Sequence, residues 1–348
     1  MKVSHYFEWE DAITGGFAQS VNNQREVLDR RGVDYTTDPT VDADLLHLNN
    51  VGPRSVYWAR RARRAGVPVL AHTHNTAADF RESFVFSNLL ARPLKPYLAW
   101  AYGQADHLVC PSAHNQDVVA GYTDTPSTVI SNGFDGDRFS GYDDADLRAE
   151  YLDRYDLDPP VVCMFGHVIK RKGLRTFVET ARAMPDTDFA WFGYLNPTGG
   201  RFDRFLQPRE TRKLVANSPD NCTFTGYIDD PRGAPAAGDV FFWPSKNENE
   251  GMALLEMMHC GLPPVVRSIP TYEWLEDGEA CLKVDGEACL KVDGEAGDGV
   301  SAFVEPLRRL CADEALREEI GTAAAEQSEE FTLETVGEDL LALYERLV

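Results

Sequence analysis

The chain has 348 residues, 43% of them hydrophobic, which is enough to build two domains of ordinary size. Acidic residues outnumber basic residues by 56 to 34, so the net charge is −22. A field of this sign repels phosphate backbones and argues against nucleic acid as a partner. The acidic bias is typical of proteins from salt-saturated cytoplasms and predicts a halophilic source.

The cysteines and the apolar stretches bear on the location of the protein. The seven cysteines are scattered and form no Cys-x-x-Cys pair, which argues against a disulfide framework and a zinc site. No stretch approaches the roughly 18 uninterrupted apolar residues of a membrane span, and residues 1–5 lack the pattern of a signal peptide. We therefore expect a cytoplasmic protein. The membrane association that fits this expectation is a peripheral one, on the inner face of the cell membrane.

The first half of the chain begins with a strand pattern followed by a helix pattern. Residues 2–7 predict a strand, and a helical pattern runs from Val21 to Gly32. Gly15 and Gly16 lie between the two, where a glycine pair lets backbone N–H groups approach an anion. A plain structural turn explains the pair equally well. The pattern differs from Gly-x-Gly-x-x-Gly, so a dinucleotide site is poorly supported.

Two histidines follow one of the next strands. Residues 43–48 and 67–71 predict short strands, and His72 and His74 come directly after the second. On an extended chain two such side chains face the same way, so their geometry permits a shared metal site. No third ligand is evident, and we expect no metal. A hydrogen-bonded histidine at the end of a strand is the alternative for His74.

The rest of the first half is apolar and then polar. Residues 84–102 are rich in aromatic and aliphatic side chains, and we expect breaks at Pro93 and Pro96. Further strands are predicted at 107–110 and 127–130. The polar segment that follows, residues 136–160, is predicted to be the linker to a second α/β half.

A basic loop opens the second half. It lies between a predicted strand, 161–165, and a predicted helix, 174–184, and it contains Arg171 and Lys172. In a chain this acidic, basic residues at such a place point to charge-assisted bonds with a diphosphate. A solvated basic start of the helix is the alternative.

Two glutamates surround the start of a later helix. The apolar run 240–243 predicts a buried strand, and the polar loop after it contains Glu248, while Glu256 lies on the helix that follows. In open α/β sheets, ligands bind at the carboxyl ends of strands, near helix N-termini. A carboxylate accepts hydrogen bonds from two adjacent hydroxyls, which suits the diol of a sugar or a ribose. A surface loop and an amphipathic helix are the alternative.

An octapeptide is duplicated near the C-terminus. Residues 277–284 are repeated without change at 285–292, a unit too short for a solenoid. The copy indicates a duplication within a surface segment or a sequence error, and residues 280–292 could form a hairpin. Helices are predicted at 314–326 and 333–348.

Together these motifs resemble family 4 of the retaining glycosyltransferases. Glu248 and Glu256 match its Glu-x7-Glu signature, Arg171 and Lys172 its diphosphate clamp, and residues 132–135 its Asn-Gly-x-Asp turn. The Glu-Asn-Glu-Gly variant at Glu248 is most similar to the branch that glycosylates membrane lipids. The resemblance runs from Gly15 to the last helix.

The resemblance implies an α/β protein with the GT-B fold, two Rossmann-like domains facing an interdomain cleft. The implied domains are an acceptor-side domain, a nucleotide-sugar-binding domain and a helix that returns to the first, at 1–150, 151–330 and 331–348. The implied catalytic residues are His74, Arg171, Lys172 and Glu248. The implied donor-binding residues are Gly15, Gly16, Tyr227, Asn249, Glu250, Gly251, Met252 and Glu256.

Each residue takes a role from the resemblance. Tyr227 would border the nucleotide base, and Glu256 would hold the ribose. Glu248 would hold the transferred sugar, and His74 would contact that sugar from across the cleft. Asp79 follows His74 at the spacing that the family shows. His167 stands where many family members carry arginine.

The implied reaction is retaining transfer of a hexose from a nucleotide-diphosphate sugar, such as a UDP-sugar, to a membrane lipid or lipid-linked acceptor. Neither a cofactor nor a metal is expected. The alternatives are transfer to a soluble glycan or glycoprotein in surface polysaccharide synthesis, and a nucleotide-sugar-binding protein without turnover. A nucleotide-dependent epimerase or dehydrogenase is disfavoured by the missing dinucleotide motif.

One segment stands out in this acidic chain because it is basic. Residues 54–102 have a net charge of +6 and contain eight tyrosine, tryptophan and phenylalanine side chains. Basic residues mixed with aromatic ones are what an interfacial helix uses on anionic lipid. We expect an anionic membrane surface to be a partner through this segment; an ordinary exposed helix over buried aromatics is the alternative.

Overall fold

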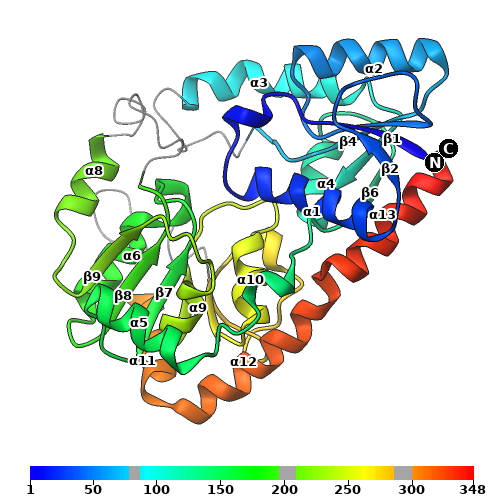
Figure 1. Ribbon diagram of the computed structural model, residues 1–348. Helices are drawn as coiled ribbons and strands as arrows, with labels where there is room; N and C mark the ends of the chain where they lie inside the picture. Colours follow the sequence, from blue (N-terminus) through cyan, green and yellow to red (C-terminus); the bar gives the residue numbers. More distant parts are fainter. Residues whose placement is uncertain (78–86, 196–208, 286–299) are drawn as a thin grey trace. The chain divides into compact units, whose positions relative to one another are not determined.

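A computed structural model of the chain describes residues 1–77, 87–195, 209–285 and 300–348. The chain forms two compact units. Unit 1 contains the described residues up to Phe134 and those from 330 to 348, and unit 2 contains the described residues from Asp135 to Glu329. Each unit is built on one sheet of six parallel strands (Figure 1), which confirms the predicted α/β class.

The sheet of unit 1 has the strand order β2-β1-β3-β4-β5-β6. Its strands are β1 Lys2–Tyr6, β2 Asp34–Thr36, β3 Leu45–Leu48, β4 Val69–His72, β5 His107–Cys110 and β6 Ser127–Val129. All neighbours are parallel. Because side chains alternate along a strand, Val3 and Leu45 pack on one face of this sheet and Leu46 and Leu108 on the other.

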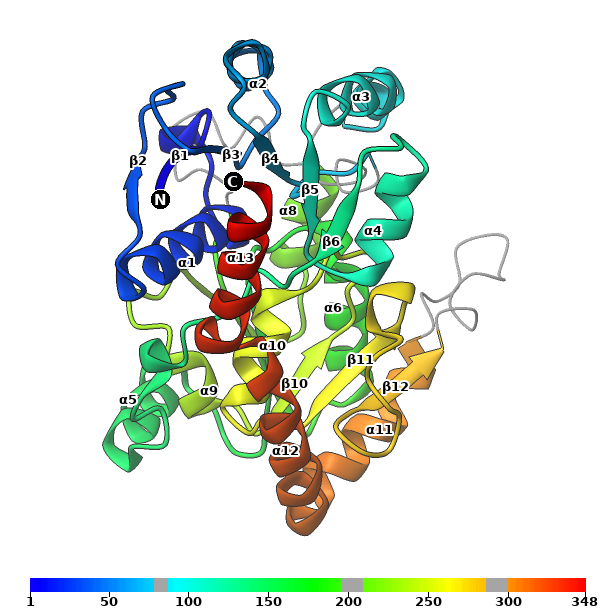
Figure 2. The same cartoon turned by 90° about the vertical axis from the view of Figure 1, so that its right-hand side faces the viewer.

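Helices cover both faces of this sheet. They are α1 Gly16–Arg30, α2 Pro53–Ala65, α3 Ser87–Tyr102, α4 Ala113–Ala120 and α13 Leu333–Leu347, with the short turn η1 Glu10–Ala12. Helices α1 and α13 lie beside one another on one face (Figures 1 and 2), where Leu340, Leu343 and Tyr344 are buried. Helices α2, α3 and α4 pack on the other face.

The sheet of unit 2 has the strand order β12-β11-β10-β7-β8-β9, again with all neighbours parallel. Its strands are β7 Val161–Phe165, β8 Asp188–Phe192, β9 Cys222–Gly226, β10 Val240–Trp243, β11 Pro264–Ser268 and β12 Leu282–Asp285. Strands β7 and β10, both predicted from continuous apolar runs, form the centre of the sheet.

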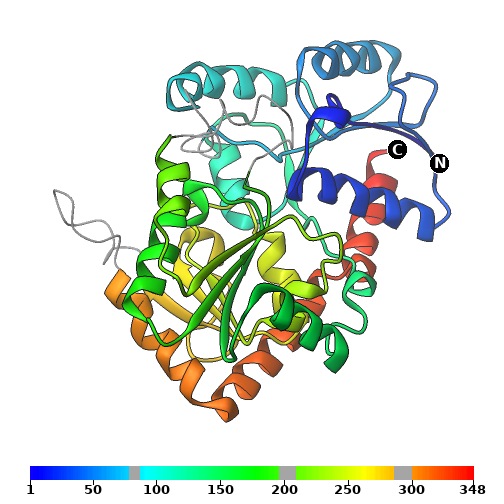
Figure 3. The ribbon, with the colours of Figure 1, turned by 60° about the vertical axis from the view of Figure 1, so that its left-hand side comes forward.

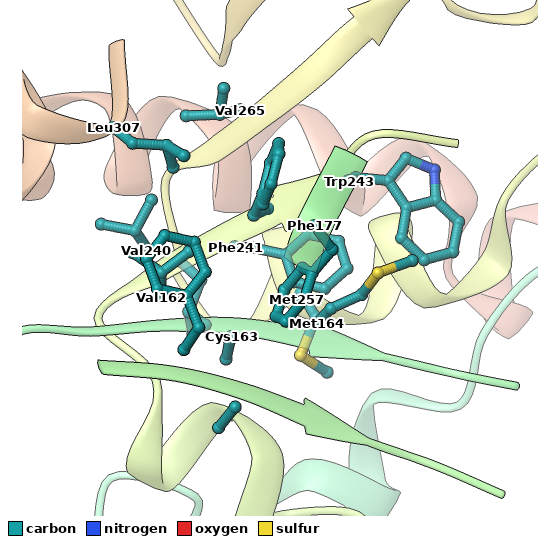
Figure 4. Packing of buried hydrophobic residues seen from close by; sticks show 14 of the residues in the cluster. Val162, Cys163, Met164, Phe177, Val240, Phe241, Trp243, Met257, Val265 and Leu307 are labelled. Carbon is teal, nitrogen blue, oxygen red and sulfur yellow. The ribbon is translucent and has the colours of Figure 1, made fainter. Parts of the chain in front are cut away.

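Unit 2 is also a three-layer structure (Figure 3). Its helices are α5 Ala145–Tyr155, α6 Leu174–Ala183, α8 Arg209–Ala216, α9 Gly233–Ala237, α10 Met252–His259, α11 Val300–Ala312 and α12 Glu314–Ser328. Its short 3₁₀ turns are η2 Gly136–Phe139, η3 Lys170–Lys172 and η4 Pro270–Tyr272. A further turn, η6 Glu329–Phe331, leads back to unit 1. Phe177 of α6 and Phe303 of α11 pack against Phe242, with ring centroids 5.8 and 5.2 Å away. Figure 4 shows the core that these layers enclose, in which Met164, Phe241 and Met257 are fully buried.

Helix α3 differs from the sequence prediction. Breaks were expected at Pro93 and Pro96, but the helix continues through both. A proline in a helix interior costs about 3 kcal/mol because it removes a hydrogen bond and crowds the preceding turn. The turn that follows buries Leu98, Ala101 and Tyr102. Burial of each large apolar side chain is worth about 1.5–3 kcal/mol, which offsets the cost.

The predicted linker is also folded. It contains α5, whose Tyr151 packs so closely on α9 that a Cβ at Gly233 would lie 1.9 Å from the ring. Arg148 of α5 forms an ion pair with Asp239 at 2.9 Å. Unit 2 therefore starts at Asp135, whereas the boundary was expected after residue 150. The many aspartates of this segment concealed its buried positions.

The duplicated octapeptide is described only in its first copy. That copy ends in β12, which pairs in parallel with β11. The second copy and the expected hairpin lie outside the described residues, as does Asp79. Within the described residues, no helix combines the length and the apolar character that crossing a bilayer requires.

Candidate functional site

The two predicted cations and the first predicted glutamate form one cluster in unit 2. Arg171 and Lys172 lie in η3, after the carboxyl end of β7, and Glu248 lies in the loop after the neighbouring strand β10. Lys172 Nζ is 2.6 Å from Glu248 Oε1, and Arg171 Nη1 is 3.3 Å from Glu248 Oε2. Gly173 brings the two loops together: it has a φ of +81°, and a Cβ there would lie 2.4 Å from the carbonyl oxygen of Pro244.

Glu248 is buried, but it is an anion. Burial alone raises the pKa of Glu248, whereas Lys172, Arg171 and a hydrogen bond from Ser245 together hold that pKa below its ordinary value. Lys172 Nζ also lies 4.2 Å from the centroid of the Trp243 ring. The cluster therefore places two cationic side chains beside the Glu248 carboxylate, and cationic side chains of this kind suit an anionic ligand.

His167 adds no charge to this cluster. Its burial, with Lys172 and Arg171 close by, lowers the pKa of His167 to about 4. At neutral pH it is therefore an uncharged imidazole, unlike the arginine that many family members carry at this position.

The residues after Glu248 lead into α10. Asn249 is half-buried and Glu250 is buried, and the helix begins at Met252. Gly251 caps it with a φ of +97°, and a Cβ there would lie 2.5 Å from the hydroxyl of Tyr272. The position therefore requires glycine, and the N–H groups of the first turn of α10 follow directly on the Glu248 loop.

Glu256 lies in a second cluster, with a partner that the sequence analysis missed. Its carboxylate is buried, and Nη1 of Arg138, in η2, is 3.4 Å from its Oε1. Burial raises the pKa of Glu256 to about 7, although Arg138 pulls it down. The signal in the sequence is slight: Arg138 is one basic residue between aspartates, three residues after the Asn-Gly-x-Asp turn.

Tyr227 also has a partner that was not predicted. Its side chain is 56% exposed and stacks on Tyr194, which follows β8, with ring centroids 4.4 Å apart and planes at 15°. Two stacked, accessible rings form a flat apolar surface of the kind on which a nucleotide base stacks.

The remaining predicted residues lie in unit 1. Gly15 caps α1 with a φ of +73°, and the helix begins at Gly16. The next residue, Phe17, contacts His74, with ring centroids 4.4 Å apart. His74 Nε2 is 3.3 Å from Asn49 Oδ1, a hydrogen bond that fits the alternative of a strand-end histidine and leaves its role in the reaction a prediction.

His74 belongs to a row of four histidines, of which only the last pair was anticipated. His72 and His74 face the same way, as predicted, and their rings stack 4.2 Å apart. His47 and His5, from β3 and β1, continue the row, with centroids 5.8 Å and then 4.9 Å apart. Burial is the largest cause that lowers the pKa of each, to about 3 for His72 and about 4 for His5, so all four are neutral.

This row is not arranged as a metal centre. Across the described residues, no group of three or more His, Cys, Asp or Glu side chains is placed to hold a metal ion. Amide and hydroxyl groups accompany the rings instead: Gln24 bridges His5 and His72, and Tyr344 of α13 contacts His47 Nδ1 at 2.6 Å.

Family models match both halves of the chain. The model described as glycosyl transferases group 1 matches residues 159–313, and the model of glycosyltransferase family 4 matches residues 27–138. The first contains Glu248 and Glu256 with Arg171 and Lys172, and the second contains Arg138 and the histidine row from His47 onward.

Individual proteins are similar over most of the chain. A processive diacylglycerol alpha-glucosyltransferase from Acholeplasma laidlawii is 32% identical over 291 residues, 81% of this chain and 84% of the relative. An alpha-galactosylglucosyldiacylglycerol synthase from Streptococcus pneumoniae (strain ATCC BAA-255 / R6) is 25% identical over 248 residues, 70% of this chain and 65% of the relative. The solved structure of Anabaena Alr3699/HepE with UDP-glucose covers 100% of both chains at 16% identity, with a TM-score of 0.76, and confirms the predicted GT-B fold.

Proposed function

This chain belongs to family 4 of the glycosyltransferases, and we propose that it transfers a hexose, with retention, from a nucleotide-diphosphate sugar to a membrane lipid or lipid-linked acceptor. The observation that carries the proposal is the buried cluster of Arg171, Lys172 and Glu248 beside the N-terminus of α10. The lipid acceptor is supported by the names of two relatives, both of which refer to diacylglycerol lipids.

Arg171 and Lys172 bind the diphosphate and stabilise it as it leaves. Negative charge develops on the phosphate oxygen when its bond to the sugar breaks, and two fixed cations in a partly buried site favour that change. In a retaining transfer, the acceptor hydroxyl attacks from the face that the phosphate leaves. The departing phosphate can take the proton of that hydroxyl, so the scheme requires no metal and no protein base.

The carboxylates hold hydroxyl groups. Glu248 binds the transferred sugar: Lys172 and Ser245 fill the two lone pairs of its Oε1, whereas Arg171 faces its Oε2, which has a second lone pair for a sugar hydroxyl. Glu256 binds the ribose, and the stacked rings of Tyr194 and Tyr227 support the base. In unit 1, the neutral His74 contacts Ser20 and Asn49 through its ring nitrogens and would bind a sugar hydroxyl in exchange for one of these contacts. Gly15 and Gly16 leave backbone N–H groups accessible at the start of α1.

The membrane contact is proposed at a groove of about 410 Å³ between α2 and α3. Its lining residues are Pro53, Val56, Tyr57, Arg60, Arg61, Arg64, Tyr97 and Trp100. The Arg60 guanidinium lies 4.9 Å from the ring centroid of Trp100, which is partly exposed, as is Tyr57. None of these described lining residues is acidic, so the groove suits anionic headgroups. Arg63, by contrast, is paired with Asp106 at 3.3 Å.

An acceptor assay tests the activity. The protein is incubated with labelled UDP- and GDP-hexoses and with vesicles that contain diacylglycerol, and in parallel with soluble oligosaccharides. We expect label in the lipid fraction, an α-linked product from an α-linked donor, and no effect of EDTA. Transfer only to soluble glycans would favour the alternative acceptor, and donor binding without any transfer would favour a binding protein.

A flotation assay tests the membrane contact. The triple substitution Arg60→Gln, Arg61→Gln and Arg64→Gln should reduce binding to anionic vesicles, and wild-type binding should weaken as salt is raised. The control triple substitution, Arg154→Gln, Arg182→Gln and Arg212→Gln in unit 2, changes the net charge equally and should bind like wild type. Equal loss in the two variants would assign the effect to net charge and reject the groove.

A further inference from the structure

Arg138 and Glu256 are far apart in the sequence but form an ion pair in unit 2. Arg138 lies in η2, three residues after the chain enters this unit, and Glu256 lies in the second turn of α10. Their closest atoms are 3.4 Å apart, the Arg138 side chain is 33% exposed and the Glu256 side chain is 8% exposed. The Arg138 guanidinium therefore contacts a carboxylate that is almost inaccessible to solvent.

The surroundings of Glu256 provide little else to favour its charge. On α10 itself, His259 is turned toward Glu329, with 3.5 Å between Nδ1 and Oε1, and Cys260 is a buried thiol whose pKa is raised. On β11, which packs against α10, Arg267 is directed to Pro244 and Thr176. Among the described residues, Arg138 is the group that pulls the pKa of Glu256 down.

The protonation of Glu256 matters for a diol ligand. An ionised carboxylate only accepts hydrogen bonds and has sites for two hydroxyl donors at once. A protonated carboxyl group keeps fewer acceptor sites, carries no charge, and forms hydrogen bonds about half as strong. With burial holding its pKa at about 7, Glu256 changes between these forms near neutral pH.

We propose that Arg138 is a positioning residue of the nucleotide site, which shifts Glu256 toward the ionised form that accepts the ribose hydroxyls. This inference rests on the proposed function, in which Glu256 binds the ribose. It predicts that affinity for the nucleotide rises with pH and that Arg138 sets the pH at which the rise occurs.

The experiment measures the affinity of UDP and of 2′,3′-dideoxy-UDP by calorimetry between pH 5.5 and pH 9, with GDP and its dideoxy analogue as a second pair. The ratio of the two affinities isolates the ribose hydroxyls, because the ionisation of the phosphates is common to both ligands. The proteins are wild type, Arg138→Gln, Arg138→Lys and Glu256→Gln, each checked for folding by its thermal unfolding.

In wild type, the ratio should rise with a midpoint near pH 7. An opposite charge at this distance shifts a pKa by about one unit or more, so Arg138→Gln should move the midpoint up by about one pH unit. At pH 7 that variant should have about a fivefold lower ratio, which recovers by pH 9. Arg138→Lys should keep the wild-type midpoint, and Glu256→Gln should give a ratio that does not change with pH.

Two results would overturn the inference. If Arg138→Gln lowers the ratio by the same factor at every pH, or if the Arg138→Lys midpoint moves as far as that of Arg138→Gln, Arg138 does not act through the ionisation of Glu256. If neither nucleotide binds wild type at any pH, the proposed function fails and the inference with it. These outcomes differ in whether UDP or GDP binds at all.

Discussion

Both parallel sheets bury polar side chains near the carboxyl ends of their strands, but they do so in opposite ways. In unit 1 the buried groups are neutral: four imidazoles in a row, with Gln24, Asn49 and Tyr344 as partners. In unit 2 they are carboxyl groups paired with cations: Glu248 lies between Lys172 and Arg171, and Glu256 is paired with Arg138.

The difference shows two solutions to the cost of burying polar groups. A neutral imidazole needs only hydrogen bonds, whereas a buried carboxylate needs a cation or loses its charge. Unit 2 thereby holds cationic side chains that suit a diphosphate, and unit 1 holds neutral groups that suit hydroxyls. This division supports the roles proposed for the two units.

The largest expected effect comes from breaking the charged cluster. Lys172→Ala should lower kcat/KM about 10- to 150-fold, because a hydrogen bond to a charged group is worth about 1.5–3 kcal/mol. The exposed lysine of α8 provides the control, since Lys213→Ala should retain wild-type kinetics. Steady-state kinetics and thermal unfolding are measured together. Near-normal transfer by a folded Lys172→Ala protein would reject the clamp.

Lowering the pH should change the stability contributed by the two buried clusters in opposite directions. The pKa of His5 is lowered from 6.5 to about 4, so the unfolded state binds more protons between these values and the stability due to His5 is lost as pH falls from 6.5. By pH 5 the loss is about 2 kcal/mol for this one histidine. Glu256 has the opposite sign: its raised pKa makes the folded state bind more protons between pH 4.5 and about 7, so its contribution grows as pH falls.

Hydrogen exchange at pH 7.5 and pH 5, corrected for the intrinsic rates, is the measurement. Protection should fall in β1, β3 and β4, which hold the histidines, before it falls in β7 and β10. Equal loss of protection in both sheets would contradict the neutral histidine row as the acid-sensitive element.

Substitutions of Glu256 and Glu248 should affect different steps of the reaction. Glu256→Gln should weaken nucleotide binding, whereas Glu248→Gln should chiefly lower the rate of sugar transfer, each by about one hydrogen bond to a charged group, or about tenfold or more. Calorimetry with the nucleotide diphosphate and steady-state kinetics are compared for both variants. Equal losses of nucleotide affinity would show that the role assignment is wrong.

The smallest effect is expected outside both clusters. Deletion of residues 285–292 joins Val284 to Asp293, which restores the Asp-Gly-Glu-Ala sequence after the strand, so β12 keeps its side-chain pattern against β11. The shortened protein should be soluble and active, as judged by expression, circular dichroism and transfer rate. Insoluble expression would mean that the copy is required.

The sequence predicted most of the architecture because buried parallel strands leave a strong local signal. The runs 161–165 and 240–243 are continuous, apolar and bounded by Gly or Pro, and both are central strands. The signal failed where packing overrides local preference: α3 continues through two prolines, and α5 folds from a segment rich in aspartate.

For the candidate site, too, the sequence predicted some features and missed others. The local order of residues determined the chemistry at each strand end: a basic turn after β7, a glutamate loop capped by Gly251 after β10, and His72 with His74 after β4. The partners of these residues, and therefore their charges, were decided only by the tertiary structure. Arg138 is 118 positions from Glu256, and the histidine row is assembled from three strands. Ionisation depends on burial and on neighbours across the fold, neither of which a local pattern contains.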